Sequence, residues 1–78
     1  MLVKVKMPDL STSDTPIRII RWLVEPGQPV KQGQVLLEVE TDKAAMEVES
    51  YMSGVLKEIV ASPDTAVEVG QIICVIES

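Results

Sequence analysis

The sequence has no histidine and no phenylalanine, and it contains a single cysteine. Without histidine, a Ser-His or Cys-His nucleophile cannot form, and the commonest metal ligand is missing. Because Cys74 lies in the apolar run Ile72–Ile76, we expect a buried small hydrophobe and not a reactive thiol. Acidic residues such as Glu47 and Glu49 are expected on a solvated strand face. These features argue against an independent enzyme and predict neither a catalytic residue nor a metal site.

Basic residues are also few. Seven Lys and Arg stand against twelve Asp and Glu, which gives a formal net charge of −5. We expect no nucleic-acid partner, since binding phosphates requires a basic surface. Attraction to a basic surface on a partner protein is compatible with this charge. The chain shows no long apolar run and no targeting segment, which predicts a protein of the cell interior without a membrane partner.

Aromatic residues are limited to Trp22 and Tyr51, although 46% of the 78 residues are hydrophobic. The core of one small domain must therefore be aliphatic, and Val and Ile favour strands. Apolar and polar residues alternate, turn signals are frequent, and no sustained helical stripe is present. Ile19 and Ile20 break the alternation, which a bulge or a strand buried on both faces would explain. The pattern predicts an all-β fold of about eight short strands, arranged as a flattened barrel or sandwich.

Two segments of the chain repeat each other. Val24–Glu40 aligns with Ala61–Glu77 at an offset of 37 positions (63 minus 26). Two units are too few for a solenoid, but two apolar faces can pack together around an approximate two-fold axis. The identical pairs are Pro26 and Pro63, Val30 and Val67, Gly33 and Gly70, Gln34 and Gln71, and Glu40 and Glu77.

A short turn separates the two repeated units. Strands are predicted over Val35–Glu40 and Ala44–Ser50, joined by Thr41–Lys43. Asp42 suits a turn, and Lys43 beside it would point into solvent. A two-fold arrangement would place this turn opposite the chain ends. A lysine held there is a candidate for covalent attachment of a cofactor, although the turn by itself is also compatible with an ordinary solvated hairpin.

The run Glu40–Ala44, which reads Glu-Thr-Asp-Lys-Ala, resembles the lipoyl-attachment motif of lipoyl domains. Such domains belong to the dihydrolipoamide acyltransferase (E2) components of 2-oxo acid dehydrogenase complexes. The resemblance implies a barrel-sandwich hybrid, with two antiparallel sheets of about four strands each and the lysine on a hairpin turn. It covers essentially the whole chain and includes Met7–Ser11, Trp22–Val24, Gly33, Gly54–Leu56 and Val67–Gly70.

The resemblance also implies roles for individual residues. Lys43 would carry lipoate in amide linkage, as N6-lipoyl-lysine, and Asp42 and Ala44 would flank it as recognition residues. The dithiolane would take an acyl group from a thiamine-dependent decarboxylase (E1). The acyl group would pass to coenzyme A at the E2 catalytic core, and dihydrolipoyl dehydrogenase (E3) would reoxidise the dithiol. A lipoylating enzyme is a further implied partner.

Residues 1–78 would form one carrier domain that does not itself catalyse the making of covalent bonds. We expect it to be a piece of a longer multidomain acyltransferase, tethered by a flexible linker after Ser78. The cytoplasm of a bacterium is the expected location, or the mitochondrial matrix if the source is eukaryotic. In place of the residues Ser13–Pro16, many relatives have an acidic residue and a glycine before the isoleucine.

Several alternatives remain open at this point. Biotinyl domains share the implied fold but usually place methionines on both sides of the lysine, whereas Asp42 and Ala44 stand there in this chain. An unmodified barrel-sandwich binding module would need no lysine at the turn. Among the complexes, the run Asp42–Glu47 is most similar to pyruvate-type domains, since 2-oxoglutarate-type domains more often have valine after the lysine. Acetoin and branched-chain complexes are further alternatives.

Overall fold

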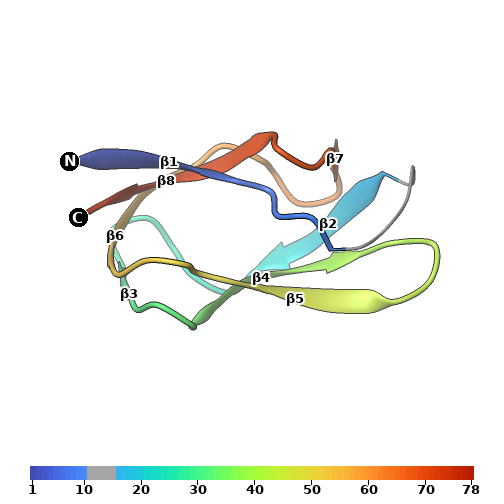
Figure 1. The fold of residues 1–78 in the computed structure, drawn as a ribbon, viewed down its shortest axis with the longest axis horizontal. Helices are drawn as coiled ribbons and strands as arrows, with labels where there is room; N and C mark the ends of the chain where they lie inside the picture. The colour runs from blue at the N-terminus through green and yellow to red at the C-terminus, as the bar shows by residue number, and fades with distance from the viewer. Residues whose placement is uncertain (11–15) are drawn as a thin grey trace.

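The structure, a computed structural model, describes residues 1–10 and 16–78. Within these ranges, eight strands form two antiparallel four-stranded sheets, in the orders β1-β8-β6-β3 and β5-β4-β2-β7 (Figure 1). This arrangement confirms the predicted all-β architecture. The strands are β1 (Leu2–Lys6), β2 (Ile17–Trp22), β3 (Pro29–Val30), β4 (Val35–Glu40), β5 (Ala45–Glu49), β6 (Gly54–Ile59), β7 (Ala66–Val67) and β8 (Ile72–Glu77).

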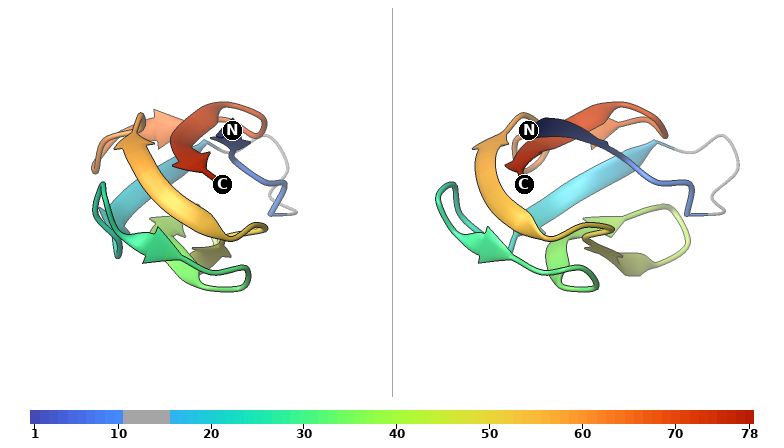
Figure 2. Two further views of the ribbon diagram at one scale, coloured as in Figure 1. Left: turned by 90° about the vertical axis from the view of Figure 1, so that its left-hand side faces the viewer. Right: turned by 60° about the vertical axis from the view of Figure 1, so that its left-hand side comes forward.

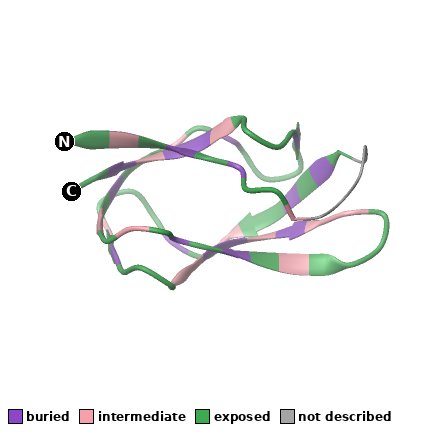
Figure 3. Ribbon diagram, viewed as in Figure 1, coloured by how far each residue is buried: buried purple, intermediate pink, exposed green. Residues whose placement is uncertain are grey.

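The two sheets wrap around one aliphatic core (Figures 2 and 3). As predicted, Cys74 is buried among its apolar neighbours. Trp22 is only partly buried, and its indole N–H donates to the carbonyl of Ala61 at 2.8 Å. The largest fully buried side chains are Met7, Ile17, Ile19, Leu36, Leu37, Leu56, Ile73, Ile76, Val39, Val67 and Cys74.

The repeat in the sequence is a repeat in the structure. Strands β2, β3 and β4 are followed 37 positions later by β6, β7 and β8, and β5 takes the place in its sheet that β1 takes in the other. Even the irregularities repeat. The register shifts between Ile19 and Arg21 on β2, and between Leu56 and Glu58 on β6. Of the two explanations for Ile19 and Ile20, the register shift favours a bulge over a strand buried on both faces, and Ile20 is 36% exposed.

One detail of the predicted alternation is wrong. Strict alternation along β4 would place Leu36 and Leu37 on opposite faces, but both side chains are fully buried. The register between β4 and β5 shifts between Val35 and Leu37, so consecutive residues turn toward the core there. The same irregularity on β8 buries both Ile73 and Cys74.

The repeated turn residues have a direct structural reason. Gly33 and Gly70 both have a φ of 88°, a region that residues with a Cβ rarely adopt. The side-chain oxygen of Gln34 accepts from the backbone N–H of Lys31 at 3.0 Å. In the second unit, Gln71 makes the same bond to the N–H of Glu68 at 3.1 Å. Each glutamine therefore closes the turn that precedes its strand, β4 in the first unit and β8 in the second.

The chain ends and the β4–β5 hairpin lie at opposite ends of the long axis (Figure 1). The N-terminal ammonium donates to the carbonyl of Ser78 at 2.9 Å, and the N–H of Ser78 donates to the carbonyl of Met1 at 3.0 Å. The molecule measures 33 × 20 × 18 Å, so the hairpin is far from the ends, as predicted. The segment Ser13–Pro16, where the sequence differs from many relatives, lies outside the described residues except for Pro16, which is exposed. Leu10 packs on the core.

Candidate functional site: the Lys43 hairpin

The candidate site is the tip that joins β4 to β5. Glu40 stands opposite Ala45 in the ladder, and the N–H of Thr41 donates to the carbonyl of Ala44 at 2.9 Å. Asp42 and Lys43 are therefore the two tip residues of a closed hairpin. The sequence predicted that the second strand begins at Ala44, but Ala44 closes the turn and β5 begins one residue later. Neither tip residue has a positive φ, so the turn has no left-handed strain.

The hydroxyl of Thr41 holds the tip together. Its oxygen accepts from the N–H of Lys43 at 3.2 Å and from the N–H of Ala44 at 3.3 Å. The same hydroxyl lies 3.3 Å from the carbonyl of Ala44, to which it donates. Sequence reasoning missed this role. The available signal was the threonine itself, since Ser and Thr hydroxyls bond to the backbone of turns two or three residues away.

Lys43 is exposed, as are Asp42 and Ala44 on either side of it. Among the described residues, the basic side chains that form ion pairs are Arg18, Arg21 and Lys57, and Lys43 is not one of them. The amine therefore extends from a fixed backbone and is not engaged in an ion pair with a described residue. An attached chain would project from the end of the molecule, and an enzyme could reach the amine without unfolding the domain. The residues present therefore fit a covalently attached group.

Two arginines of β2 brace the strand that leads to the tip. Arg18 bonds to Glu40 at 2.9 Å and to Asp64 at 2.9 Å, and Arg21 bonds to Glu38 at 2.5 Å. The hydrogen bond from Arg18 to Asp64, and then the charge of Glu40, raises the pKa of the Arg18 guanidinium. Each pair is exposed, so its individual contribution to stability is small. Sequence reasoning did not find this network, because it depends on the strand register.

Asp64 has a φ of 65° and occupies the place that Gly27 holds in the first unit. Aspartate tolerates this left-handed conformation better than most residues. Its carboxylate also accepts a hydrogen bond from Nη2 of Arg18.

The described residues contain no helix that is long and apolar enough to cross a membrane. They also contain no cluster of three or more acidic or cysteine side chains that could hold a metal ion.

The fold and this hairpin can be compared with known proteins. The Biotin_lipoyl family, described as "Biotin-requiring enzyme", matches residues 3–76, and the chain belongs to this family. In its fold, the chain is similar to the lipoyl domain of the 2-oxoglutarate dehydrogenase complex from Azotobacter vinelandii. The TM-score is 0.76 at 29% sequence identity, over 97% of this chain and 96% of that domain.

The chain is homologous to acyltransferase components of two kinds of complex. The dihydrolipoyllysine-residue succinyltransferase of the Bacillus subtilis 2-oxoglutarate dehydrogenase complex is 42% identical over 72 residues, which is 92% of this chain. The dihydrolipoyllysine-residue acetyltransferase of the Zymomonas mobilis pyruvate dehydrogenase complex is 42% identical over 76 residues, which is 96% of this chain. The chain spans only 17% of the length of each of these relatives.

Proposed function

We propose that the chain is a lipoyl carrier domain of the acyltransferase component of a 2-oxo acid dehydrogenase complex, with Lys43 as the attachment residue. One observation carries the proposal. This chain has a fold similar to that of a lipoyl domain, and it presents one lysine, which is in no ion pair with a described residue, at the tip of a closed hairpin. Relatives named as acyltransferases of such complexes support it.

The chain's own part is to hold and present the amine. Thr41 fixes the backbone on both sides of the tip, and the β4–β5 ladder fixes the direction in which the tip projects. When bound, the lipoyl group supplies a two-electron disulfide/dithiol couple. Amide formation at Lys43 removes one positive charge, so the formal net charge changes from −5 to −6. The domain provides position and recognition, and no group in it needs to make or break a bond.

Asp42 and Ala44 are proposed as the residues by which a lipoylating enzyme recognises the turn. Both are exposed at the same tip as the lysine. Ala44 is small and leaves the lysine approachable, and Asp42 adds a negative charge next to it. Biotinyl domains usually have methionine at these two places, so the flanks favour lipoate over biotin.

The proposed complex is of the pyruvate type, because Ala44 and Ala45 follow the lysine where 2-oxoglutarate-type domains more often have valine. The Bacillus subtilis relative of the 2-oxoglutarate type and the Zymomonas mobilis relative of the pyruvate type are both 42% identical to this chain. The partners would be a thiamine-dependent decarboxylase, dihydrolipoyl dehydrogenase, the E2 catalytic core and a lipoylating enzyme, in the cytoplasm. Residues 1–78 would act as one domain tethered in a longer chain, which keeps the effective concentration at each active site high.

Intact-mass measurement tests the attachment. The chain would be incubated with lipoate, ATP and a lipoyl ligase, and separately with biotin, ATP and a biotin ligase. We expect one lipoyl increment, no biotin increment, and neither increment in a Lys43→Arg variant. A lipoyl increment that survives in Lys43→Arg would refute the assignment, and a biotin increment alone would favour a biotinyl carrier. An unmodified chain in both reactions would favour a binding module.

Reductive acylation tests the choice of complex. The lipoylated chain would be offered to decarboxylases for pyruvate, 2-oxoglutarate and acetoin, with the cognate substrate of each. The proposal predicts the highest rate of mass gain with the pyruvate decarboxylase. A higher rate with either other enzyme would reassign the complex without affecting the role of Lys43.

A further inference from the structure

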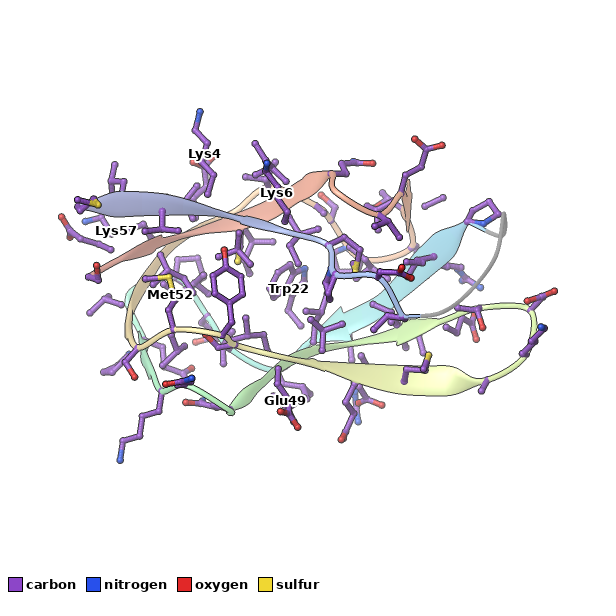
Figure 4. All side chains as sticks on the ribbon, in the orientation of Figure 1. Lys4, Lys6, Trp22, Glu49, Met52 and Lys57 are labelled. Atoms are coloured by element: carbon purple, nitrogen blue, oxygen red, sulfur yellow. The ribbon has the colours of Figure 1, made fainter. Side chains whose placement is uncertain are left out.

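The two edge strands β1 and β5 occupy equivalent places but carry opposite charges. Each lies at the end of its sheet, next to β8 and β4 respectively. The exposed residues Lys4 and Lys6 on β1 correspond to Glu47 and Glu49 on β5, at an offset of 43 positions (45 minus 2). The labelled Lys4 and Glu49 point away from the molecule on opposite sides in Figure 4. The fold therefore needs polar residues here, but it does not determine their sign.

The backbone of β5 presents hydrogen-bonding groups that the rest of the described chain does not use. Thr41 and Ala44 form a hydrogen-bonded pair, so the alternation of an antiparallel ladder directs the N–H and C=O of Ala45 and Glu47 away from β4. Farther along, Ser50 bonds inward, because its N–H donates to Gln34 at 2.8 Å. The intervening Glu49 consequently also faces outward. Three alternate residues of this edge can accept another strand.

The carboxylates of β5 are also unpaired. On the neighbouring β4, Glu38 and Glu40 are matched by Arg21 and Arg18. Among the described ion pairs, none includes Glu47 or Glu49. Glu47 stands directly opposite Glu38, and the cation that pairs with Glu38, Arg21, is already engaged. A cation from another molecule would relieve the repulsion between these acidic side chains.

We propose that the β5 edge is a docking surface for an extended basic segment of a partner protein, which adds as a further strand beside Lys43. Backbone hydrogen bonds to Ala45, Glu47 and Glu49 would hold the segment, as in other cases of strand addition. Its lysine or arginine side chains, at alternate positions, would face Glu47 and Glu49. The edge is about 17 Å long, enough for one such segment.

This inference rests on the proposed function in one respect, because the proposed function explains why a partner approaches this end of the domain. The docking itself requires no attached group. Loss of the Lys43 amine should therefore leave it intact, and the two proposals can fail separately. Acylation of Lys43 would remove the positive charge that precedes the strand and would strengthen the attraction to a basic segment.

The test uses an acetylated and amidated peptide of about eight residues that alternates valine and lysine. It would be titrated into the unmodified 15N-labelled chain at low ionic strength. We expect saturable shifts and slower hydrogen exchange at the amides of Ala45, Glu47 and Glu49. A Glu47→Gln/Glu49→Gln variant should bind about fivefold to tenfold more weakly, since each opposed charge pair contributes modestly. The matched Lys4→Gln/Lys6→Gln variant and Lys43→Ala should bind no more weakly than the parent chain.

A second peptide separates strand addition from simple charge attraction. Methylation of its alternate backbone nitrogens removes hydrogen-bond donors and keeps every charge, so binding should fall to an undetectable level. Equal binding of both peptides would overturn the proposal, because the backbone edge would then be irrelevant. The proposal would also be overturned if the NMR shifts were located on β1, or if no shifts appeared up to about 1 mM peptide. Unchanged affinity in the double glutamine variant would overturn it as well. Those outcomes would leave the glutamates as charges that only keep the edge from self-association.

Discussion

The two ends of the molecule are built alike but differ in what they carry. At one end, Met1 and Ser78 bond to each other through their backbones at 2.9 and 3.0 Å. At the other end, Thr41 and Ala44 occupy the equivalent places, and the N–H of Thr41 bonds to Ala44 at 2.9 Å. Only this second end has Asp42 and Lys43 between the paired strands. The strand pair is thus a property of the fold, and the lysine turn is an addition to it.

The same comparison separates the shared residues from the different ones along the whole chain. Shared residues are the turn glycines, the turn glutamines and the buried aliphatics, and each has a packing or hydrogen-bonding reason. Different residues are mostly charged and exposed, such as Glu47 against Lys4. Shared positions therefore report on stability, and exposed positions that differ are free to serve recognition. Substitutions can test this division.

The largest effect is expected where the two units differ inside the fold. Gly54 is equivalent to the buried Ile17, yet a Cβ at Gly54 would lie 2.4 Å from the carbonyl oxygen of Glu77 and 2.8 Å from Ile76. A Gly54→Ala substitution must push β6 away from β8 and should lower the free energy of unfolding by about 3 kcal/mol. Urea denaturation measures this, with the adjacent, 37% exposed Val55→Ala as control. If Gly54→Ala lowered the free energy of unfolding no more than the control, then the position of Gly54 would tolerate a side chain as the equivalent position of Ile17 does.

A smaller effect should appear in alkaline solution and only in the second unit. Burial raises the pKa of the Cys74 thiol to about 11, whereas the equivalent Leu37 does not titrate. Above about pH 9 the unfolded thiol ionises while the folded thiol keeps its proton, so the free energy of unfolding falls until the pH reaches the folded pKa. The loss from this group should be about 2 kcal/mol by pH 11.

Unfolding curves at several pH values, compared between the parent chain and Cys74→Ala, measure this contribution. The stability of Cys74→Ala should decline less over the same range, because its other titrating groups are unchanged. Parallel declines in the two proteins would show that ionisation of Cys74 does not oppose folding.

The smallest effect tests the equivalence itself. Gly33 and Gly70 have the same φ of 88°, and a Cβ at either position would meet no atom within 4 Å. Replacement by alanine should therefore cause only backbone strain, about 1 kcal/mol at each position. Thermal or urea unfolding of Gly33→Ala and Gly70→Ala should give equal losses within error. Clearly unequal losses would show that the two turns are not equivalent in energy.

The sequence was sufficient for the strands, the repeat and the exposed tip, because these depend on local alternation, turn residues and spacing. It was insufficient where register decides the outcome. Leu36 and Leu37 are both buried because of a ladder irregularity, and Arg18 meets Asp64 across 46 positions of chain. The hydroxyl of Thr41 was within reach of sequence reasoning, since its bonds are local. The attachment of lipoate at Lys43 is a proposal that the geometry fits.

The most direct test of the central claim lets all five lysines of the chain compete for the same enzyme. Lys4, Lys6, Lys31 and Lys57 are exposed like Lys43, and Lys31 also precedes a turn. After reaction with lipoate and a lipoyl ligase, the chain would be digested and the modified lysine located by tandem mass spectrometry. The account predicts the lipoyl increment on Lys43 alone, because only that lysine stands at the tip of a closed hairpin. An increment on Lys31 or any other lysine, with Lys43 unmodified, would contradict it.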